Sequence, residues 1–281
     1  MKTFKLSAIF LLLAIFAVSA FAQKLKPEEV IAKHLESIGT AEVRASVKNQ
    51  MAVGDVLVTF VSQKNQTAEG RIVMVSEGTK NFLGMNLNAA DYPLEKFSYD
   101  GKNAKVAYVR TNIRSVLGNF VKSNDLLLEE SLLGGTLSTS WALANTVGGK
   151  AKISFDGLKK IDGKEAYMLT YSPKGGGDVD IKLYFDKENF RHIRSEYKRT
   201  SSAAIGRTID ESARQSETRL KVTETFGDFK TETGLTLPHS YSLNYSTTGQ
   251  NGTTEIEWKF ALTQFMFNQS LDAKTFDADA K

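Results

Sequence analysis

The sequence predicts a mainly β protein of the α+β class, built on a strongly curved antiparallel sheet with one N-terminal helix and further short helices. Three observations predict this class. Apolar residues recur at every second position over most of the chain, turn residues separate these runs, and one stretch near the N-terminus follows helical spacing. Because short turns rather than long helical crossovers join the runs, we expect consecutive hairpins.

The first element is a leader that directs export. Two lysines precede an uncharged apolar run from residue 6 to residue 21, which ends in the triplet Ala20-Phe21-Ala22. This order is typical of a secretory signal peptide, and a run of about 16 residues is shorter than the roughly 20 that a membrane-spanning helix needs. We expect residues 1–22 to be removed, by cleavage after Ala22 or Ala20, and the mature protein to reside in the periplasm.

The mature chain is expected to begin with a short amphipathic helix. Pro27 and the two glutamates after it are typical of a first helical turn, because proline has no amide proton to leave unpaired and the acids oppose the positive end of the helix dipole. Gly39 marks its end. Between them, apolar residues and one histidine recur at helical spacing: Val30, Ile31, His34, Leu35 and Ile38.

From about residue 43 the pattern becomes alternation, which predicts strands. It is clear at residues 56–61, 153–155 and 181–185. Turn residues lie between the alternating runs, at Asp100-Gly101, Asp162-Gly163, Gly175 to Gly177, Asp186 to Asn189, and Asn251-Gly252.

The clearest hairpin lies on either side of Asn251-Gly252. One of its faces is apolar and is formed by Tyr241, Leu243, Tyr245, Ile256, Trp258, Phe260 and Leu262. The opposite face is polar and should contact water; it carries Ser240, Ser242, Asn244, Ser246, Glu255, Glu257 and Lys259.

Two stretches depart from alternation. Residues 113–147 are rich in leucine and glycine, and apolar positions within 113–121 and 126–133 suit one or two short helices. Residues 200–218 are almost wholly polar, which favours a long surface loop. Since no linker or internal repeat stands out, residues 23–281 are expected to form a single domain.

Composition excludes several classes of function. The chain has no cysteine, which excludes disulfides and thiolate chemistry. It has 36 basic and 32 acidic side chains; without Lys2 and Lys5 the mature protein has a net charge of about +2, which does not indicate nucleic acid binding. After residue 22 no apolar stretch approaches spanning length, so no integral membrane segment is expected in the mature chain.

The sequence contains no recognisable catalytic constellation. Its three histidines have no metal-ligand spacing, and nucleophile-elbow and dinucleotide motifs are absent, so we expect neither an enzyme nor a metal or cofactor site. Ser195-Glu196-Tyr197-Lys198 matches an SxxK string, but in a strand its serine and lysine lie on opposite faces. Asp178 and Asp180 fit the edge of a solvated hairpin.

The remaining clue to function is the shape of the sheet. A curved sheet with a continuous apolar inner face must either fill that face with helices or leave a pocket for an apolar ligand. At about 24 cal/mol per Å³ an empty pocket of roughly 400 Å³ would cost about 10 kcal/mol, comparable to the stability of a whole domain. A lipid-sized void must therefore be plugged by a movable helix, hydrated, or kept occupied.

Five segments carry a resemblance to a known family. They are the opening helix at 28–39 (EEVIAKHLESIG), the hairpin run 161–170 (IDGKEAYMLT), the strands 181–186 (IKLYFD) and 193–197 (IRSEY), and the strand–turn–strand 226–238 with its FGDF and GLTLP strings. Together with the order of elements, they resemble the LolA-like superfamily of periplasmic lipoprotein carriers and outer-membrane lipoprotein-sorting proteins.

The resemblance implies a fold and a class of function. Members have an unclosed antiparallel β-barrel in which helices cover a hydrophobic cavity, and they bind acyl chains without catalysis. It implies that residues 113–147 supply the covering helices, and that six residues line the concave face and bind ligand: Tyr241, Leu243, Tyr245, Ile256, Trp258 and Phe260. The arginine that latches the cover in such proteins has two candidates here, Arg44 and Arg71.

Two functions therefore stand at this point. The first is binding of lipid or lipoprotein acyl chains in the periplasm, with a place in outer-membrane lipoprotein sorting and envelope proteins as further partners. The second is a structural or envelope-interaction protein whose inner face is a solid core and which takes no small-molecule ligand. Truncation of Trp258 separates them, because a core residue affects stability whereas a pocket residue affects ligand uptake.

Overall fold

The computed structural model describes residues 25–145, 151–173, 175–203, 208, 216–250 and 252–280. The expected signal peptide, residues 1–22, lies outside these ranges, as does most of the loop expected at 200–218. The described residues of that loop, at 202, 203, 208, 216 and 217, are exposed.

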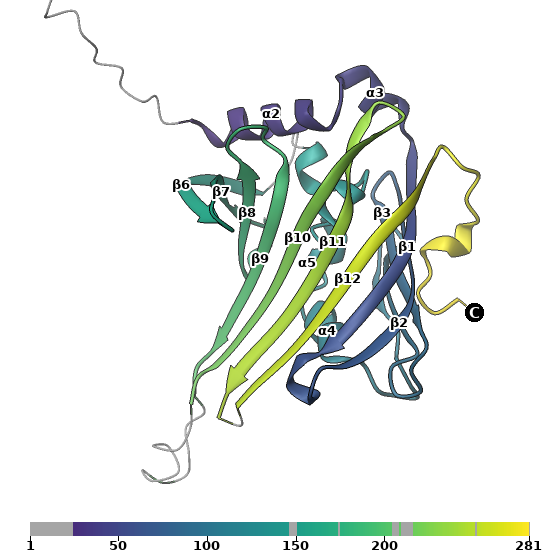
Figure 1. The fold of residues 1–281 in the computed structure, drawn as a ribbon, viewed down its shortest axis with the longest axis vertical. Helices are drawn as coiled ribbons and strands as arrows, with labels where there is room; N and C mark the ends of the chain where they lie inside the picture. The colour runs from purple at the N-terminus through teal and green to yellow at the C-terminus, as the bar shows by residue number, and fades with distance from the viewer. Residues whose placement is uncertain are drawn as a thin grey trace, which may run out of the picture.

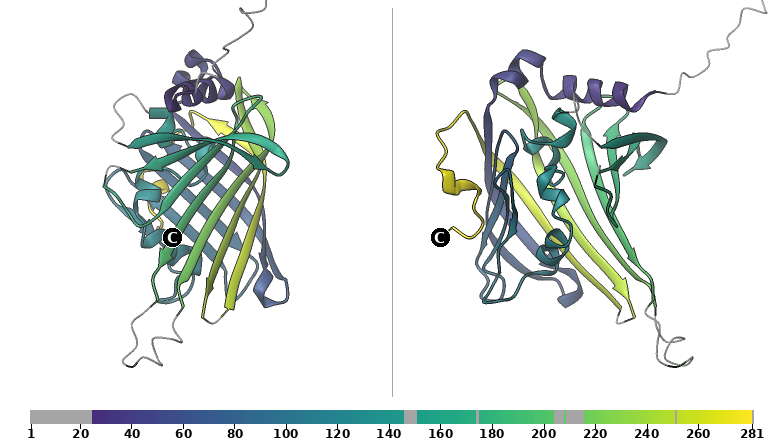
Figure 2. Two further views of the ribbon diagram at one scale, coloured as in Figure 1. Left: turned by 90° about the vertical axis from the view of Figure 1, so that its left-hand side faces the viewer. Right: turned by 180° about the vertical axis from the view of Figure 1, so that it is seen from behind.

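Twelve strands form one antiparallel sheet, as Figures 1 and 2 show. Their spatial order is β5-β4-β3-β2-β1-β12-β11-β10-β9-β8-β7-β6. All paired strands are consecutive in sequence except β1 and β12, and the consecutive strands β5 and β6 form the two edges. The strands are β1 Asn49–Phe60, β2 Gln66–Glu77, β3 Lys80–Leu87, β4 Leu94–Tyr99, β5 Ala104–Val106, β6 Lys152–Ile161, β7 Lys164–Ser172, β8 Asp180–Asp186, β9 His192–Ser201, β10 Thr218–Glu232, β11 Leu235–Gly249 and β12 Gly252–Phe267.

The sheet curls without closing. No pairing between described residues joins the edge strands β5 and β6. Bending is helped near the middle of the sheet by Gly54, where β1 shifts register against β12 and a Cβ atom would lie only 2.0 Å from the carbonyl oxygen of Ala261. The predicted mainly β fold, an unclosed antiparallel barrel with short helices, is confirmed.

One segment covers the concave side of the sheet. We name residues 107–145 the insert; it contains the helices α4 Val116–Lys122 and α5 Leu126–Glu129 and the 3-10 turns η2 Gly135–Leu137 and η3 Ala142–Asn145. Figures 1 and 2 show α4 and α5 inside the curl of the sheet. Its apolar side chains complete the hydrophobic core; Leu117, Leu127 and Leu132 have no exposed surface.

The helices of the insert are shorter than the sequence suggests. Helix α5 ends at Glu129, although leucines continue to Leu133, because Ser131 and the pair Gly134-Gly135 have positive φ angles that no helix can accommodate. At the other end of the insert, Ile113 and Val116 were expected on the apolar helix face, but both are exposed.

Two helices lie across one end of the curled sheet (Figure 1). The expected N-terminal helix is confirmed as α2 Pro27–Ile38, which buries His34 together with Val30 and Ile31. The expectation of strand from residue 43 is wrong for the next few residues, because α3 Ala41–Ser46 follows. Thr40 caps α3 by accepting a hydrogen bond from the Val43 amide.

Two short 3-10 turns complete the described elements, η1 Val61–Gln63 and η4 Ala273–Phe276. Residues after β12 run along the outside of the sheet, where the Ala278 amide donates to Ser98 and Lys105 pairs with Asp277. In the described part of the chain, no helix combines the length and the apolar character that crossing a membrane requires.

Candidate functional site: the concave face and its rim cavity

The six residues expected to line the concave face lie together on the inner side of β11 and β12. The register pairs Tyr241 with Phe260, Leu243 with Trp258, and Tyr245 with Ile256. Five of them are buried beneath the insert, and Ile256 is partly buried against the same core. That they share one buried apolar face is as the alternation predicted; that they line a ligand site, which the resemblance implied, stays a prediction.

Trp258 begins a chain of buried polar contacts. Its indole Nε1 donates to the Tyr92 hydroxyl at 3.2 Å, and Tyr92 donates to Glu95 Oε2 at 2.5 Å. Glu95 has no exposed surface, and burial raises the pKa of its carboxyl to about 7, although contacts with Ser115 and Tyr92 lower it. These hydrogen bonds hold Trp258 at its indole nitrogen, in addition to the packing of its apolar rings.

A second buried acid, Glu224, joins the sheet to the insert. Its Oε1 accepts hydrogen bonds from the Gly134 amide at 2.7 Å and from the Tyr241 hydroxyl at 2.6 Å, and its Oε2 lies 2.7 Å from the Tyr197 hydroxyl. Burial raises the pKa of the Glu224 carboxyl, and these contacts only partly oppose the rise. Glu224 therefore favours the neutral acid.

The contacts of Tyr197 are satisfied together by one arrangement of protons, with a proton on Glu224. The Tyr197 hydroxyl also lies 2.7 Å from the Leu132 carbonyl oxygen, which belongs to the insert. A phenol has one proton to donate and a carbonyl can only accept. Both contacts are satisfied when Tyr197 donates to Leu132 and the protonated Oε2 of Glu224 donates to Tyr197.

Two buried histidines flank the insert beside Glu224. The ring of Trp141 stacks on His192 with centroids 4.8 Å apart and meets His34 edge-on at 5.2 Å. Burial lowers the pKa of His34 to about 4 and that of His192 well below its ordinary value, so both are neutral at neutral pH. His34 Nδ1 donates to the Phe190 carbonyl at 2.8 Å.

Four buried polar atoms in this region have no hydrogen-bond partner among the described residues. They are His34 Nε2, His192 Nδ1, Trp141 Nε1 and Thr136 Oγ1. Thr136 and Trp141 belong to the insert, whereas His34 lies on α2 and His192 on β9. A buried polar group without a partner costs about 1–3 kcal/mol, so this region carries unmet polar groups on both sides of the contact.

Further polar contacts attach the insert to β1–β3. Gln50 donates to the Leu137 carbonyl at 3.1 Å, and the Asn81 amide donates to Ser131 Oγ at 2.7 Å. Thr139 donates to Ser76 Oγ through its amide at 2.8 Å and through its hydroxyl at 3.0 Å. Displacement of the insert would therefore break polar contacts as well as expose apolar surface.

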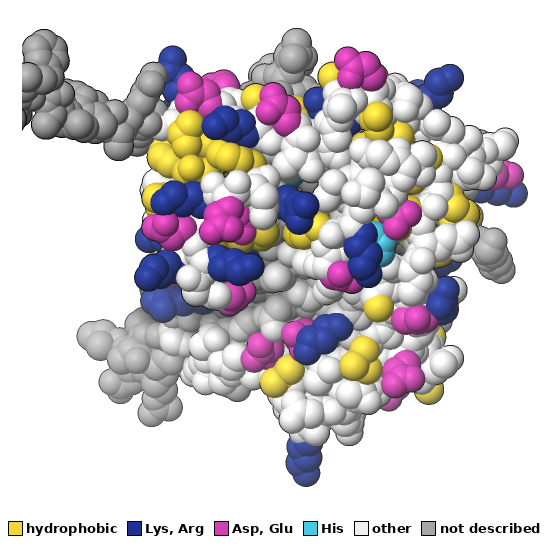
Figure 3. Space-filling view, turned by 45° about the horizontal axis from the view of Figure 1, so that its top comes forward, with side chains coloured by type: hydrophobic (Ala, Val, Ile, Leu, Met, Phe, Trp, Pro, Cys, Tyr) yellow, Lys and Arg dark blue, Asp and Glu magenta, His cyan; other side chains and the backbone are white. Residues whose placement is uncertain are grey.

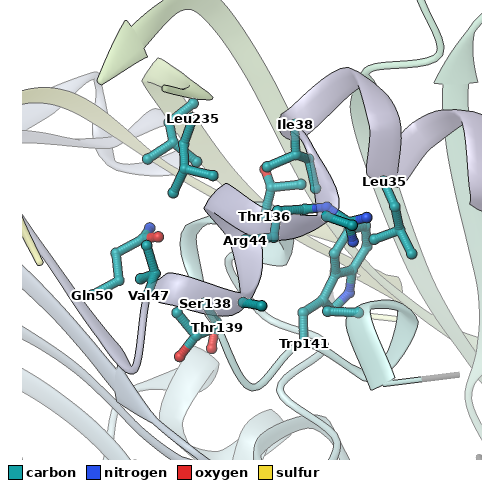
Figure 4. Close-up of a pocket in the computed structure, with 14 residues that line it drawn as sticks. Leu35, Ile38, Arg44, Val47, Gln50, Thr136, Ser138, Thr139, Trp141 and Leu235 are labelled. Atoms are coloured by element: carbon teal, nitrogen blue, oxygen red, sulfur yellow. The ribbon is translucent and has the colours of Figure 1, made fainter. Parts of the chain in front are cut away.

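A cavity of about 390 Å³ lies where the insert meets α2 and α3 (Figure 4). We name it the rim cavity. Its apolar lining comes from the two helices, the insert and the start of β11, and its polar lining is smaller. The lining residues are Leu35, Ile38, Ala41, Arg44, Ala45, Val47, Gln50, Thr136, Ser138, Thr139, Trp141, Ala144, Leu235 and Leu237. None of the six expected ligand residues is among them.

The two candidate latch arginines lie in different places. Arg71 forms an ion pair with Asp55, and both side chains are exposed. Arg44 lines the rim cavity, and its Nε donates to the Gly39 carbonyl at 3.1 Å, within its own helix–turn–helix segment. The described residues thus show no hydrogen bond from either arginine to the insert.

The serine and the lysine of the SxxK string lie in different surroundings. Ser195 is buried and bonded to His192 on the inner side of β9, whereas Lys198 is exposed and pairs with Glu196, so the SxxK string does not bring serine and lysine together. Within the described ranges, no group of three or more potential metal ligands lies together. Over the end of the molecule that Figure 3 shows, side chains of both charge signs are interspersed.

Sequence reasoning missed the residues that hold the insert. One sequence signal could have pointed to them: Glu224 is a single acid in an otherwise apolar alternating series of β10, Val222, Glu224 and Phe226. Trp141 and the rim cavity had no comparable signal, because the cavity is assembled from three segments distant in the chain.

Comparison with known proteins gives similarity in structure only. No protein-family model and no curated protein matches the sequence. Among solved structures, a LolA superfamily protein from Nitrosomonas europaea is 12% identical and covers 91% of this chain and 99% of its own, with a TM-score of 0.47. A putative outer membrane lipoprotein-sorting protein domain from Vibrio parahaemolyticus is 15% identical and covers 88% of this chain and 97% of its own, with a TM-score of 0.45.

A DUF1329 family protein from Desulfovibrio piger is also similar, at 9% identity and a TM-score of 0.40, over 89% of this chain and 96% of its own. The resemblance to LolA-like proteins inferred from the sequence is thus found again among solved structures. At these identities the similarity concerns the fold alone.

Proposed function

We propose that this protein binds acyl chains of lipids or lipoproteins in the periplasm, without catalysis, against the concave face of its sheet. The observation that carries the proposal is that the concave face is covered by a separate segment of the chain. A single segment, the insert, packs its apolar side chains into the core on the concave side of the sheet, and an apolar-lined cavity remains where its last part meets α2 and α3.

In this function the insert is a plug that an acyl chain displaces. The concave face would otherwise lie open to water at the cost of a large apolar surface, so a plug is the physical solution for a carrier between loads. Two buried polar atoms of the insert, Thr136 Oγ1 and Trp141 Nε1, have no partner among the described residues, so moving these two side chains breaks no hydrogen bond of their own. Ligand would then contact Tyr241, Trp258 and their neighbours.

The family resemblance extends this proposal to outer-membrane lipoprotein sorting, in which an exported carrier receives and delivers its load at envelope proteins. Such a role requires the periplasmic location that the leader predicts. Residues 23–281 would act as one half-barrel domain.

A second candidate is a structural or envelope-interaction protein with a solid core. It is favoured by the polar anchoring of the insert through Glu224, Tyr197, Ser76 and Asn81, and by the complete burial of Trp258. In that case the insert never leaves the sheet, and no acyl chain reaches the inner face.

Lipid analysis of the native protein separates the two functions. Protein purified from the periplasm without denaturant is extracted and its lipids are identified by mass spectrometry, and the delipidated protein is titrated with a fluorescent fatty acid. The carrier function predicts co-purified acyl lipid and saturable uptake. Absence of both would leave the structural function.

A further inference from the structure

We propose that the rim cavity binds the anionic head of a single-chain amphiphile, a carboxylate or phosphate carried on one acyl chain, with Arg44 as its charge partner. The inference rests on the proposed acyl-binding function and names the class of ligand and the residue that selects it.

Arg44 is the one charged residue among the fourteen that line the cavity. Its side chain is half-buried, and the hydrogen bond from Nε to the Gly39 carbonyl fixes one edge of the guanidinium. The Nη groups have no hydrogen-bond partner among the described residues. A guanidinium with unused donors presents a planar pair of N–H groups that matches a carboxylate or phosphate.

No acid within the cavity neutralises this charge. Glu42, on the same helix, is exposed and does not line the cavity, although Arg44 contributes in a small part to its lowered pKa. The field of Arg44 also reaches His34, whose pKa it lowers in addition to the larger effect of burial. An anion that enters the cavity would therefore meet a cation that no lining acid neutralises, in an environment that water only partly screens.

The remaining walls suit one acyl chain. The apolar lining comes from Leu35, Ile38 and Val47, from the insert residue Trp141, and from Leu235 and Leu237 of β11. Figure 4 shows Leu35, Ile38, Val47, Trp141 and Leu235 around the cavity. A volume of about 390 Å³ lies near the lower end of the roughly 300–1,000 Å³ that small-molecule pockets occupy, which favours a single chain over a multiply acylated lipid.

Two lining residues offer further polar groups. Thr136 Oγ1 and Trp141 Nε1 are both buried and lack partners among the described residues, and both belong to the insert. A head group with acceptor oxygens can accept from each of them after a small side-chain rotation. Binding at the cavity would thus act directly on the segment that must move for an acyl chain to reach the concave face.

The test compares ligands that share a ten-carbon chain and differ in the head. Decanoate and decyl phosphate carry an anion, 1-decanol is neutral and decyltrimethylammonium is cationic; each displaces a fluorescent fatty acid from delipidated mature protein at pH 7.5. We expect both anions to bind more tightly than the other two, and Arg44→Gln to weaken anion binding about 10- to 100-fold while leaving decanol unchanged.

Two controls keep the result specific. Arg71→Gln removes an equivalent charge from an exposed ion pair and should leave every affinity unchanged. Arg44→Lys keeps the charge but not the planar donor pair, and should retain a preference for anions with reduced affinity. The ratio of decanoate to decyl phosphate affinity tells a fatty acid from a phosphate-bearing lipid.

The failures are distinguishable. If the wild-type protein takes up decyl ligands but shows no preference for an anion, or keeps that preference in Arg44→Gln, the assignment of the rim cavity is wrong and acyl binding stands. If no decyl ligand and no fluorescent fatty acid binds, both the assignment and the proposed function are wrong.

Discussion

Replacement of Glu224 tests the polar link between the sheet and the insert. In Glu224→Gln the amide oxygen can still accept from Gly134 and Tyr241, and the amide N–H can donate to Tyr197, which still donates to Leu132. If the carboxyl of Glu224 is protonated in the native protein, the amide reproduces its donors and acceptors. The free energy of unfolding should then stay within about 1 kcal/mol of the wild type, the size of one net hydrogen bond.

Glu224→Ala should behave differently. It leaves the Gly134 amide and the Tyr241 hydroxyl buried without an acceptor, and at about 1–3 kcal/mol for each such group the loss is about 2–6 kcal/mol. Urea denaturation followed by tryptophan fluorescence measures both variants, since the two tryptophans, Trp141 and Trp258, are buried in the native state.

The pH dependence provides the second readout. Because the pKa of Glu224 is raised in the folded state, its contribution to stability is fully present below the ordinary carboxyl pKa and is lost as pH rises through the folded-state pKa. The wild type should therefore lose stability relative to Glu224→Gln between acid and alkaline pH. The placement of the proton would be refuted if Glu224→Gln and Glu224→Ala lost equal amounts of stability and if the difference in stability between the wild type and Glu224→Gln stayed constant across pH.

Three further predictions use the same denaturation assay. Trp258→Ala should cost about 3–5 kcal/mol because its side chain is fully buried, whereas Lys259→Ala on the exposed face should change stability by less than about 0.5 kcal/mol; similar effects would contradict the burial. Glu95 has a folded-state pKa of about 7, above the ordinary value of 4.5 for a glutamate carboxyl. The wild type should therefore lose about 3 kcal/mol of stability relative to Glu95→Gln between pH 4.5 and pH 8. A stability difference that does not change with pH would show that the carboxyl titrates normally. Gly135→Ala should lower stability by about 1–3 kcal/mol more than Gly78→Ala does. Both glycines have positive φ angles, but only at Gly135 would a Cβ atom lie 2.7 Å from His192. Equal losses of stability would mean that the insert shifts to make room for the Cβ atom.

The sequence determines the faces of the sheet well because alternation is a local property. Spacing alone placed Tyr241, Leu243 and Trp258 on one apolar face of their hairpin, and the two-residue turn at Asp162-Gly163 joins β6 and β7 as its residues predict. Helix α2 was equally accessible, since Pro27 and Gly39 mark its ends.

The parts that sequence could not give depend on contacts between distant segments. The rim cavity needs Leu35, Thr136 and Leu235 to come together, and no local pattern encodes that approach. Helix α3 was missed because six residues give too few turns for a periodic signal. Helix α5 was expected to be longer because its leucines continue beyond the point at which Ser131 takes a positive φ angle.

The claim that the insert moves to admit an acyl chain is tested most directly by locking it in place. Ser76 Oγ and Thr139 Oγ1 are 3.0 Å apart, close enough for cysteines at these positions to form a disulfide between β2 and the insert. Since the chain has no cysteine, Ser76→Cys/Thr139→Cys can form no other intramolecular bond, and Thr139→Cys alone serves as the control.

Uptake of a fluorescent fatty acid is measured for the oxidised double variant and again after reduction. A carrier whose insert is a plug predicts wild-type uptake in the reduced protein and its loss in the oxidised one. Equal uptake in both forms would contradict displacement of the insert, and no uptake in either form or in the wild type would contradict acyl binding itself.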